Sequence, residues 1–139
     1  MIFAGCKVNF VLAIDYDDTL FLGGWDVPGT PNHPVLAQAK RFCEHPCCEV
    51  ILWTCREERL LVAAIDKCEE YGLRFDAVNM NTREALQWNV KQFGRHGPAI
   101  GRKVYADLYV DDKSPGSIEH FLSLDPNVEW NKVRSRKID

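Results

Sequence analysis

The stretch that most constrains the fold covers residues 8–20. It begins as a near-continuous apolar run rich in β-branched and aromatic residues, which is typical of a strand buried on both faces. The run ends in three closely spaced carboxylates, Asp15, Asp17 and Asp18, and Thr19 follows them. A buried strand carries its C-terminal end to the rim of an α/β sheet, where ligands bind. Crowded like charges repel unless a cation or a proton lies between them, so the Asp-x-Asp-x-Thr spacing favours a metal or catalytic site over a polar turn.

Two later segments repeat the pattern of an apolar strand that ends in polar side chains. Residues 49–53 lead into Thr54, and residues 106–110 lead into Asp111 and Asp112. Strands that alternate with helices form a parallel sheet, whose carboxyl ends share one rim. We therefore predict an α/β fold, a three-layer α/β/α Rossmann-like domain with a mostly parallel central sheet. Carboxylates from separate strands at that rim form a site for a hard cation such as Mg²⁺.

Thr54 has two interpretations at this stage. Its hydroxyl suits a phosphate oxygen, and it also suits the N-cap of the helix predicted over residues 57–71. Both can hold at once.

Residues 21–32 are rich in glycine and proline and form a loop directly after the first carboxylates. Trp25 is the large apolar residue of this loop. It either covers the edge of the core or contacts a substrate, because aromatic side chains near a site often bind ligands. The candidate substrate contacts are Asp18, Trp25 and Arg56.

Length, composition and charge limit the domain organisation and the classes of protein to which the chain can belong. With 139 residues, 46% hydrophobic and 27% charged, the chain is predicted to form a single domain over 1–139, with its core over about 8–122. Residues 123–139 are predicted to form a C-terminal strand that includes Val128 and Trp130, and then a basic tail. The net charge of −3 argues against a broad nucleic-acid binder, and no apolar run reaches the length of a membrane span.

The six cysteines are interpreted as reduced thiols, because a chain with this much core does not need disulfides. Lys7 interrupts the apolar N-terminus, so we expect no secretory signal. These features predict a cytoplasmic protein.

Three motifs in order give the chain a specific resemblance to the haloacid dehalogenase (HAD) superfamily of phosphotransferases. Residues 14–20 are similar to the family's first motif, residues 51–54 to its second and residues 109–112 to its fourth. The resemblance extends over about residues 8–121. Asp18 departs from it, because the family commonly has glycine there. The third motif, a basic residue ahead of the last strand, is assigned to Lys103, with Arg102 and Lys91 as alternatives.

The resemblance implies a Mg²⁺-dependent phosphatase that acts on phosphomonoesters through an aspartyl-phosphate. Asp15 is the implied nucleophile and Asp17 the implied general acid and base. Thr54 and Lys103 are the implied phosphoryl ligands. The implied metal ligands are Asp15, the backbone carbonyl of Asp17, Asp112, and Asp111 through water.

Members of the superfamily often carry a cap domain that sets specificity. The intervals between the motifs hold only a loop, helices and a strand, so we expect no cap domain. An open site fits a phosphorylated small molecule, a phosphorylated macromolecule, or a homo-oligomer whose neighbour supplies a lid. Two alternatives stay open: a phosphatase for nucleic-acid ends, favoured by the basic tail and disfavoured by the net acidity, and a non-catalytic module that retains the fold.

Overall fold

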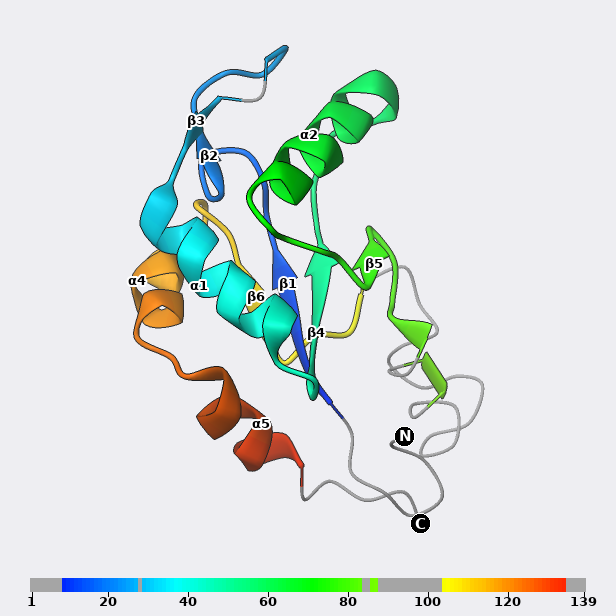
Figure 1. Ribbon diagram of the computed structural model, residues 1–139, viewed down its shortest axis with the longest axis vertical. Helices are drawn as coiled ribbons and strands as arrows, with labels where there is room; N and C mark the ends of the chain where they lie inside the picture. Colours follow the sequence, from blue (N-terminus) through cyan, green and yellow to red (C-terminus); the bar gives the residue numbers. More distant parts are fainter. Residues whose placement is uncertain (1–8, 28, 84–85, 88–103, 135–139) are drawn as a thin grey trace.

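The computed structural model describes residues 9–27, 29–83, 86–87 and 104–134 of the chain. Strands and helices alternate along most of this length (Figure 1). In chain order the elements are β1 (Phe10–Ile14), β2 (Phe21–Leu22), β3 (Thr30–Pro31), α1 (His33–Glu44), β4 (Cys48–Leu52), α2 (Glu58–Glu70), β5 (Ala77–Val78), β6 (Leu108–Val110), α4 (Ser117–Leu122) and α5 (Pro126–Val133).

The main sheet has four strands in the order β5-β4-β1-β6. Every neighbouring pair in it is parallel. In register, Ile14 at the end of β1 lies opposite Leu52 of β4 on one side and Val110 of β6 on the other. A parallel sheet flanked by helices confirms the predicted α/β class and is consistent with the three-layer Rossmann-like arrangement.

Strand β1 is buried at all five of its residues because it contributes to a core on each face of the sheet. Leu12 and Ile14 pack into a core with residues of helices α1, α2 and α4. Val11 and Ala13 belong to a second cluster that includes Ile51 and Val104. Apolar contacts on both faces explain why the segment has an unbroken apolar sequence instead of an alternating one.

The two long helices, α1 and α2, each pack one face against the core. Helix α1 begins at His33, with Pro34 in its first turn, and buries an apolar face that includes Phe42. Helix α2 ends ahead of Gly72, whose φ of 83° is the left-handed conformation that favours glycine after a helix. No helix in the described part of the chain combines the length and the apolar character needed to span a membrane.

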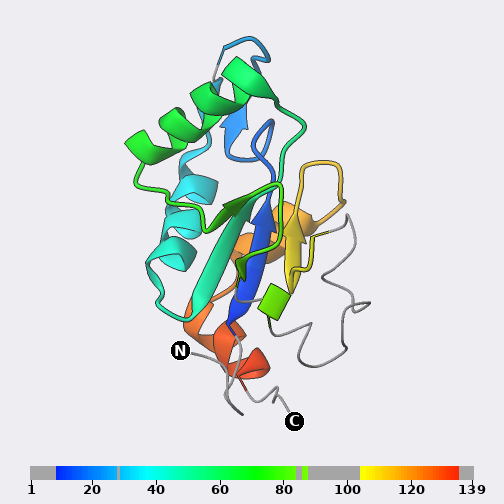
Figure 2. The same ribbon diagram turned by 90° about the vertical axis from the view of Figure 1, so that its right-hand side faces the viewer.

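A short antiparallel pair, β2 with β3, follows directly after the first carboxylates. We call residues 21–31 the hairpin. The hairpin and helix α2 lie at the end of the sheet where β1 terminates, whereas α5 lies at the opposite end (Figures 1 and 2). Between Ile14 and His33, the described residues form only this hairpin and its turns.

The predicted C-terminal strand is wrong. Residues 126–133, which include Val128 and Trp130, form helix α5. The Asp125 side chain accepts hydrogen bonds from the backbone N–H groups of Asn127 and Val128, and Pro126 occupies the first turn. These start signals explain why a helix forms here instead of a strand.

Leu12→Ala tests the importance of β1. Leu12 is fully buried at the centre of the larger core, so we expect the free energy of unfolding to fall by about 2–5 kcal/mol. Chemical denaturation measures this change. Val62→Ala, on the exposed side of α2 (57% exposed), should change the free energy by less than about 0.5 kcal/mol. Equal effects of the two substitutions would contradict the assignment of β1 as the centre of the core.

Candidate functional site

The strand order places a topological switch point between β1 and β6. The chain runs from β1 outward to β4 and β5, and then returns to add β6 on the other side of β1. The backbone N–H of Asp15 donates to the carbonyl of Val110 at 2.9 Å, so the pairing continues to the last residue before Asp111. Ligands of open α/β sheets bind at the carboxyl ends of the strands at such a point.

Three carboxylates meet at this switch point. One oxygen from each of Asp15, Asp111 and Asp112 lies within 4.8 Å of the others, and all three residues are partly buried. We call these residues the carboxylate group. Its oxygens are close enough together for one small cation that prefers oxygen ligands, such as Mg²⁺. The sequence predicted that the ends of the strands before Asp15 and before Asp111 and Asp112 share one rim, and these two strand ends supply the three carboxylates.

The carboxylate group has little compensating positive charge among the described residues. The Nζ of Lys113 lies 3.4 Å from Asp112 Oδ2, but the Lys113 side chain is 84% exposed. An exposed ion pair of this kind is weak because water screens it. The group is therefore suited to a cation that enters it and neutralises it.

Burial and crowding change the pKa values of Asp15 and Asp112. Burial, and next to it the charge of Asp111, raise the pKa of Asp15 to about 7. Burial acts in the same direction on Asp112, but hydrogen bonds with Asp111 and Lys113 outweigh it and lower the pKa of Asp112. Without a cation, the Asp15 carboxyl therefore keeps its proton up to near neutral pH.

Thr19 joins the two sides of the carboxylate group. Its buried hydroxyl donates to Asp15 Oδ2 at 3.4 Å and accepts from the backbone N–H of Asp112 at 3.1 Å. The sequence motif includes Thr19, but this role in the site was not predicted. The signal was its fixed spacing after Asp15, which places it back beside that carboxyl after one tight turn.

Local hydrogen bonds also fix the turn after β6. The Ser117 hydroxyl accepts from the N–H of Asp111 at 3.2 Å and donates to the carbonyl of Tyr109 at 3.1 Å. Asp111 Oδ1 accepts from the N–H of Lys113 at 2.9 Å. The turn is thereby held in one conformation, with Asp111 and Asp112 both directed to the rim.

Asp17 lies outside the carboxylate group and has a different partner. Its carboxylate accepts from Arg56 Nε at 3.0 and 3.2 Å and from Arg56 Nη2 at 2.7 Å. The side chain of Arg56 is fully buried, whereas that of Asp17 is 23% exposed. The hydrogen bond to Asp17 raises the pKa of Arg56 above its ordinary value. In this arrangement Arg56, a predicted substrate contact, is not accessible to a substrate.

Asp18 occupies a position that demands an unusual backbone. Its φ of 60° lies in the left-handed region, where most L-residues pay a steric cost and glycine does not. The side chain offsets part of this cost by accepting from the N–H of Gly23 at 2.9 Å. This geometry explains why glycine is expected in the motif and how aspartate is tolerated. It also gives Asp18 a role in the turn beside its predicted substrate contact.

Thr54 lies near the rim at the end of β4, as predicted, but it is not the N-cap of α2, which is Glu57. The Thr54 hydroxyl instead accepts from the N–H of Arg56 at 3.1 Å, and the Thr54 N–H donates to Asn79 Oδ1 at 2.8 Å. These bonds fix the loop between β4 and α2.

The predicted third motif lies outside the described residues. This holds for Lys103 and for both alternatives, Arg102 and Lys91. Trp25 is described: it is 53% exposed, and its ring lies 5.2 Å from the Arg56 guanidinium. Both interpretations of Trp25 are therefore compatible with its place, since one side contacts protein and much of its surface is open.

Comparisons with known proteins support the fold. No protein-family model matches the chain, and no curated protein matches it significantly. Among solved structures, the chain is similar to a conserved protein of Bacteroides thetaiotaomicron, with 26% sequence identity and a TM-score of 0.61. The similarity covers 90% of this chain and 89% of that one, so it extends over nearly the whole α/β arrangement.

The raised pKa of Asp15 predicts a pH-dependent stability. Because the pKa is about 7 in the folded state against an ordinary 3.8, the folded protein binds the proton more tightly than the unfolded chain. The contribution to stability is therefore present at low pH and is lost as pH rises from about 4 to about 7. Asp15→Asn mimics the neutral carboxyl, so in EDTA it should raise the melting temperature at pH 8 and change it little at pH 5.

Thermal unfolding at the two pH values measures the effect. Asp66→Asn, an exposed change on α2, serves as the control and should not distinguish the two pH values. If Asp15→Asn stabilises the protein equally at pH 5 and pH 8, the ionisation of Asp15 is not the cause of the stabilisation.

Proposed function

We propose that this protein is a Mg²⁺-dependent phosphatase of the HAD superfamily, which hydrolyses phosphomonoesters through an aspartyl-phosphate. The observation that carries the proposal is the convergence of Asp15, Asp111 and Asp112 within 4.8 Å at the switch point of the sheet. The motif resemblance adds a specific chemistry to that convergence.

The carboxylate group fits a magnesium ion by its donors. Asp15 and Asp112 supply ionisable oxygens, Asp111 a further one through water, and the Asp17 carbonyl completes the set that the resemblance implies. All are hard oxygen donors, and only a minority of the ligands of a Mg²⁺ site need to be protein groups, since the ion keeps several waters. Bound there, Mg²⁺ would offset the repulsion between a carboxylate nucleophile and an anionic phosphate.

Asp15 is the proposed nucleophile. One of its oxygens forms a bond to phosphorus as the bond from phosphorus to the leaving-group oxygen breaks. The Thr19 hydroxyl holds Asp15 Oδ2 at 3.4 Å, and this contact restricts the rotation of the carboxyl. The attack needs Asp15 ionised, and the bound cation favours that form.

Asp17 is the proposed acid and base. It donates a proton to the departing oxygen, and in the second half of the reaction it takes a proton from the water that attacks phosphorus. Inorganic phosphate leaves, and Asp15 is regenerated. A carboxylate at this position suits hydrolysis, and its partial exposure lets water reach it.

Thr54 and Lys103 are the proposed ligands of the phosphoryl oxygens. The Thr54 hydroxyl accepts one hydrogen bond, from the N–H of Arg56, and its own proton can be donated to a phosphate oxygen. A lysine supplies a compact positive charge for the same group.

The proposed substrate is a phosphorylated small molecule or macromolecule, because the hairpin is short and no cap domain lies between Ile14 and His33 in the described residues. We also propose a cytoplasmic location. The cysteines of the described residues, Cys43, Cys47, Cys48, Cys55 and Cys68, are all free thiols, as expected in a reducing compartment.

Turnover of p-nitrophenyl phosphate tests the proposal. We expect hydrolysis with Mg²⁺, loss of activity in EDTA and recovery when Mg²⁺ is added back. Asp15→Asn should lower kcat by about 10³-fold or more, because it removes the nucleophile. Asp66→Asn should keep the parent activity. No turnover with Mg²⁺, or equal turnover by Asp15→Asn, would contradict a HAD-type phosphatase.

Orthovanadate binding tests the third motif. Lys103→Ala should weaken vanadate binding measured by calorimetry in the presence of Mg²⁺, since it removes a charge that contacts the phosphoryl group. Arg102→Ala is the matched control and should bind as the parent does. The reverse result would assign the third motif to Arg102.

A further inference from the structure

Arg56 is a buried cation in the immediate neighbourhood of the proposed site. Its residue exposure is 1%, and its side chain is fully buried against the partly exposed Asp17 carboxylate. Burial of a charged side chain is costly unless the charge is paired and its donors are satisfied. The contacts of this guanidinium therefore indicate the role of Arg56.

The first contact is a set of hydrogen bonds from two guanidinium nitrogens to the Asp17 carboxylate. Oδ1 accepts from Nη2 at 2.7 Å and from Nε at 3.2 Å, and Oδ2 accepts from Nε at 3.0 Å. Two nitrogens of one planar group on one carboxylate fix its rotation as well as its position. Arg56 contacts Asp17 from the protein interior, because the Arg56 side chain is buried and the Asp17 side chain is partly exposed.

The same guanidinium also binds backbone carbonyls of two other segments. Nη2 donates to the carbonyls of Gly24 and Val27 in the hairpin, each at 3.3 Å. Nη1 donates to the carbonyl of Leu60 in the first turn of α2, at 3.4 Å. One side chain thus joins Asp17 to the hairpin and to α2, the two elements that lie at the carboxyl end of the sheet (Figures 1 and 2).

Two aromatic rings enclose the guanidinium. The Arg56 Cζ lies 4.7 Å from the centroid of the buried Tyr16 ring and 5.2 Å from that of Trp25. Arginine stacks on such rings and is weakly hydrated, which makes it the cation suited to this place. Lysine offers a compact charge and three donors, so it does not reproduce both the planar stacking and the hydrogen bonds to Asp17.

We propose that Arg56 is a positioning residue for the hydrolytic half-reaction: it holds the Asp17 carboxylate in the orientation that takes a proton from the attacking water. This inference rests on the proposed function. Arg56 acts through Asp17 and does not touch the substrate, because its donors are directed to Asp17 and to backbone carbonyls and its side chain is not accessible.

The half-reaction in question breaks the aspartyl-phosphate. A water oxygen forms a bond to phosphorus, the bond from phosphorus to the Asp15 oxygen breaks, and the water proton passes to Asp17. The preceding half-reaction differs when the substrate is p-nitrophenyl phosphate, because p-nitrophenolate departs without needing a proton. With this substrate, a displaced Asp17 slows only the second half-reaction.

Arg56→Lys and Arg56→Gln provide the test, with p-nitrophenyl phosphate and Mg²⁺. We expect kcat to fall by about 10²-fold, within the usual contribution of a general base, while kcat/KM changes little. Rapid mixing should then reveal a burst of p-nitrophenol about equal to the enzyme concentration, since the phosphorylated enzyme accumulates. Two variants are used so that the failure of one to fold, checked by thermal unfolding, leaves the other.

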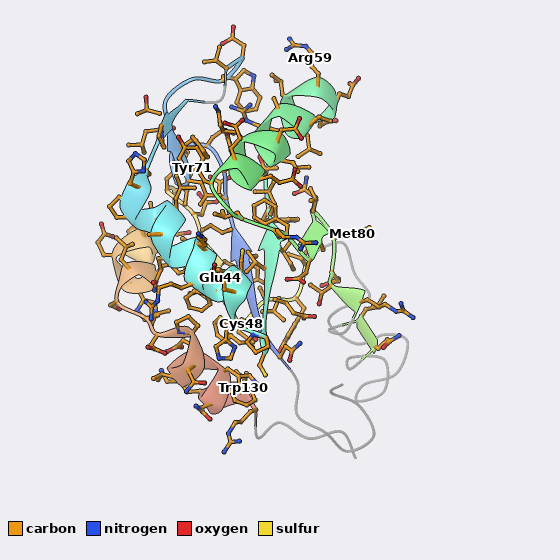
Figure 3. All side chains as sticks on the ribbon, in the orientation of Figure 1. Glu44, Cys48, Arg59, Tyr71, Met80 and Trp130 are labelled. Atoms are coloured by element: carbon orange, nitrogen blue, oxygen red, sulfur yellow. The ribbon has the colours of Figure 1, made fainter. Side chains whose placement is uncertain are left out.

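Arg59→Lys is the matched control. Arg59 is an exposed arginine in the first turn of α2, and its side chain is directed away from the sheet (Figure 3); the variant should keep the parent kcat without a burst. Asp17→Asn should give the same burst as the Arg56 variants. Because Arg56 acts through Asp17, the double variant Arg56→Lys/Asp17→Asn should have a kcat no lower than that of Asp17→Asn alone.

The outcomes separate this inference from the proposed function. An increase in KM with unchanged kcat would make Arg56 a substrate ligand, and a parallel loss of kcat and kcat/KM without a burst would make it merely structural; either result overturns the inference and leaves the phosphatase in place. Absence of turnover by the parent protein with Mg²⁺ would overturn the proposed function itself, and this inference with it.

Discussion

The site depends on the pairing of β1 with a parallel neighbour on each side. Ile14 lies opposite Leu52 of β4 and Val110 of β6, so three strands terminate at nearly the same level. A slip of one residue in either pairing would turn the side chains to the other face of the sheet. The burial of β1 on both faces opposes such a slip, and in this way the hydrophobic core also determines where Asp15 meets Asp111.

The cost of this arrangement is electrostatic. Three carboxyls within 4.8 Å repel each other, and the described residues around them supply mostly hydrogen bonds, such as those of Thr19 and Ser117, instead of balancing charges. Burial, and next to it the charge of Asp111, raises the pKa of Asp15 to about 7, so desolvation and repulsion both disfavour its ionised form. A proton or a cation reduces the repulsion between the carboxyls. Because a bound cation removes this repulsion, the repulsion favours cation binding.

The sequence was sufficient for features that depend on local pattern. The apolar run before Asp15 identified β1, and the polar residues after each strand identified the rim, because parallel strands share one end. The sequence was insufficient to predict the burial of Arg56 and its pairing with Asp17. The two residues lie far apart along the chain, and no periodicity indicates that Arg56 is buried. The error at residues 126–133 was of another kind: the start signals at Asp125 and Pro126 were present, but two apolar residues were given more weight.

Asp15 and Asp17 show how neighbouring residues of one short motif acquire different surroundings. Asp15 is directed into a group of like charges that calls for a cation, whereas Asp17 is held by a buried arginine that already neutralises it. The turn between them, with Asp18 in a left-handed conformation, separates the two carboxyls. The proposed roles need these opposite surroundings: the proposed nucleophile Asp15 must approach an anionic phosphate, and the proposed base Asp17 must keep one orientation beside water. The pairing of Arg56 with Asp17 is therefore the contact that makes the surroundings of Asp17 different from those of Asp15, although both belong to one motif.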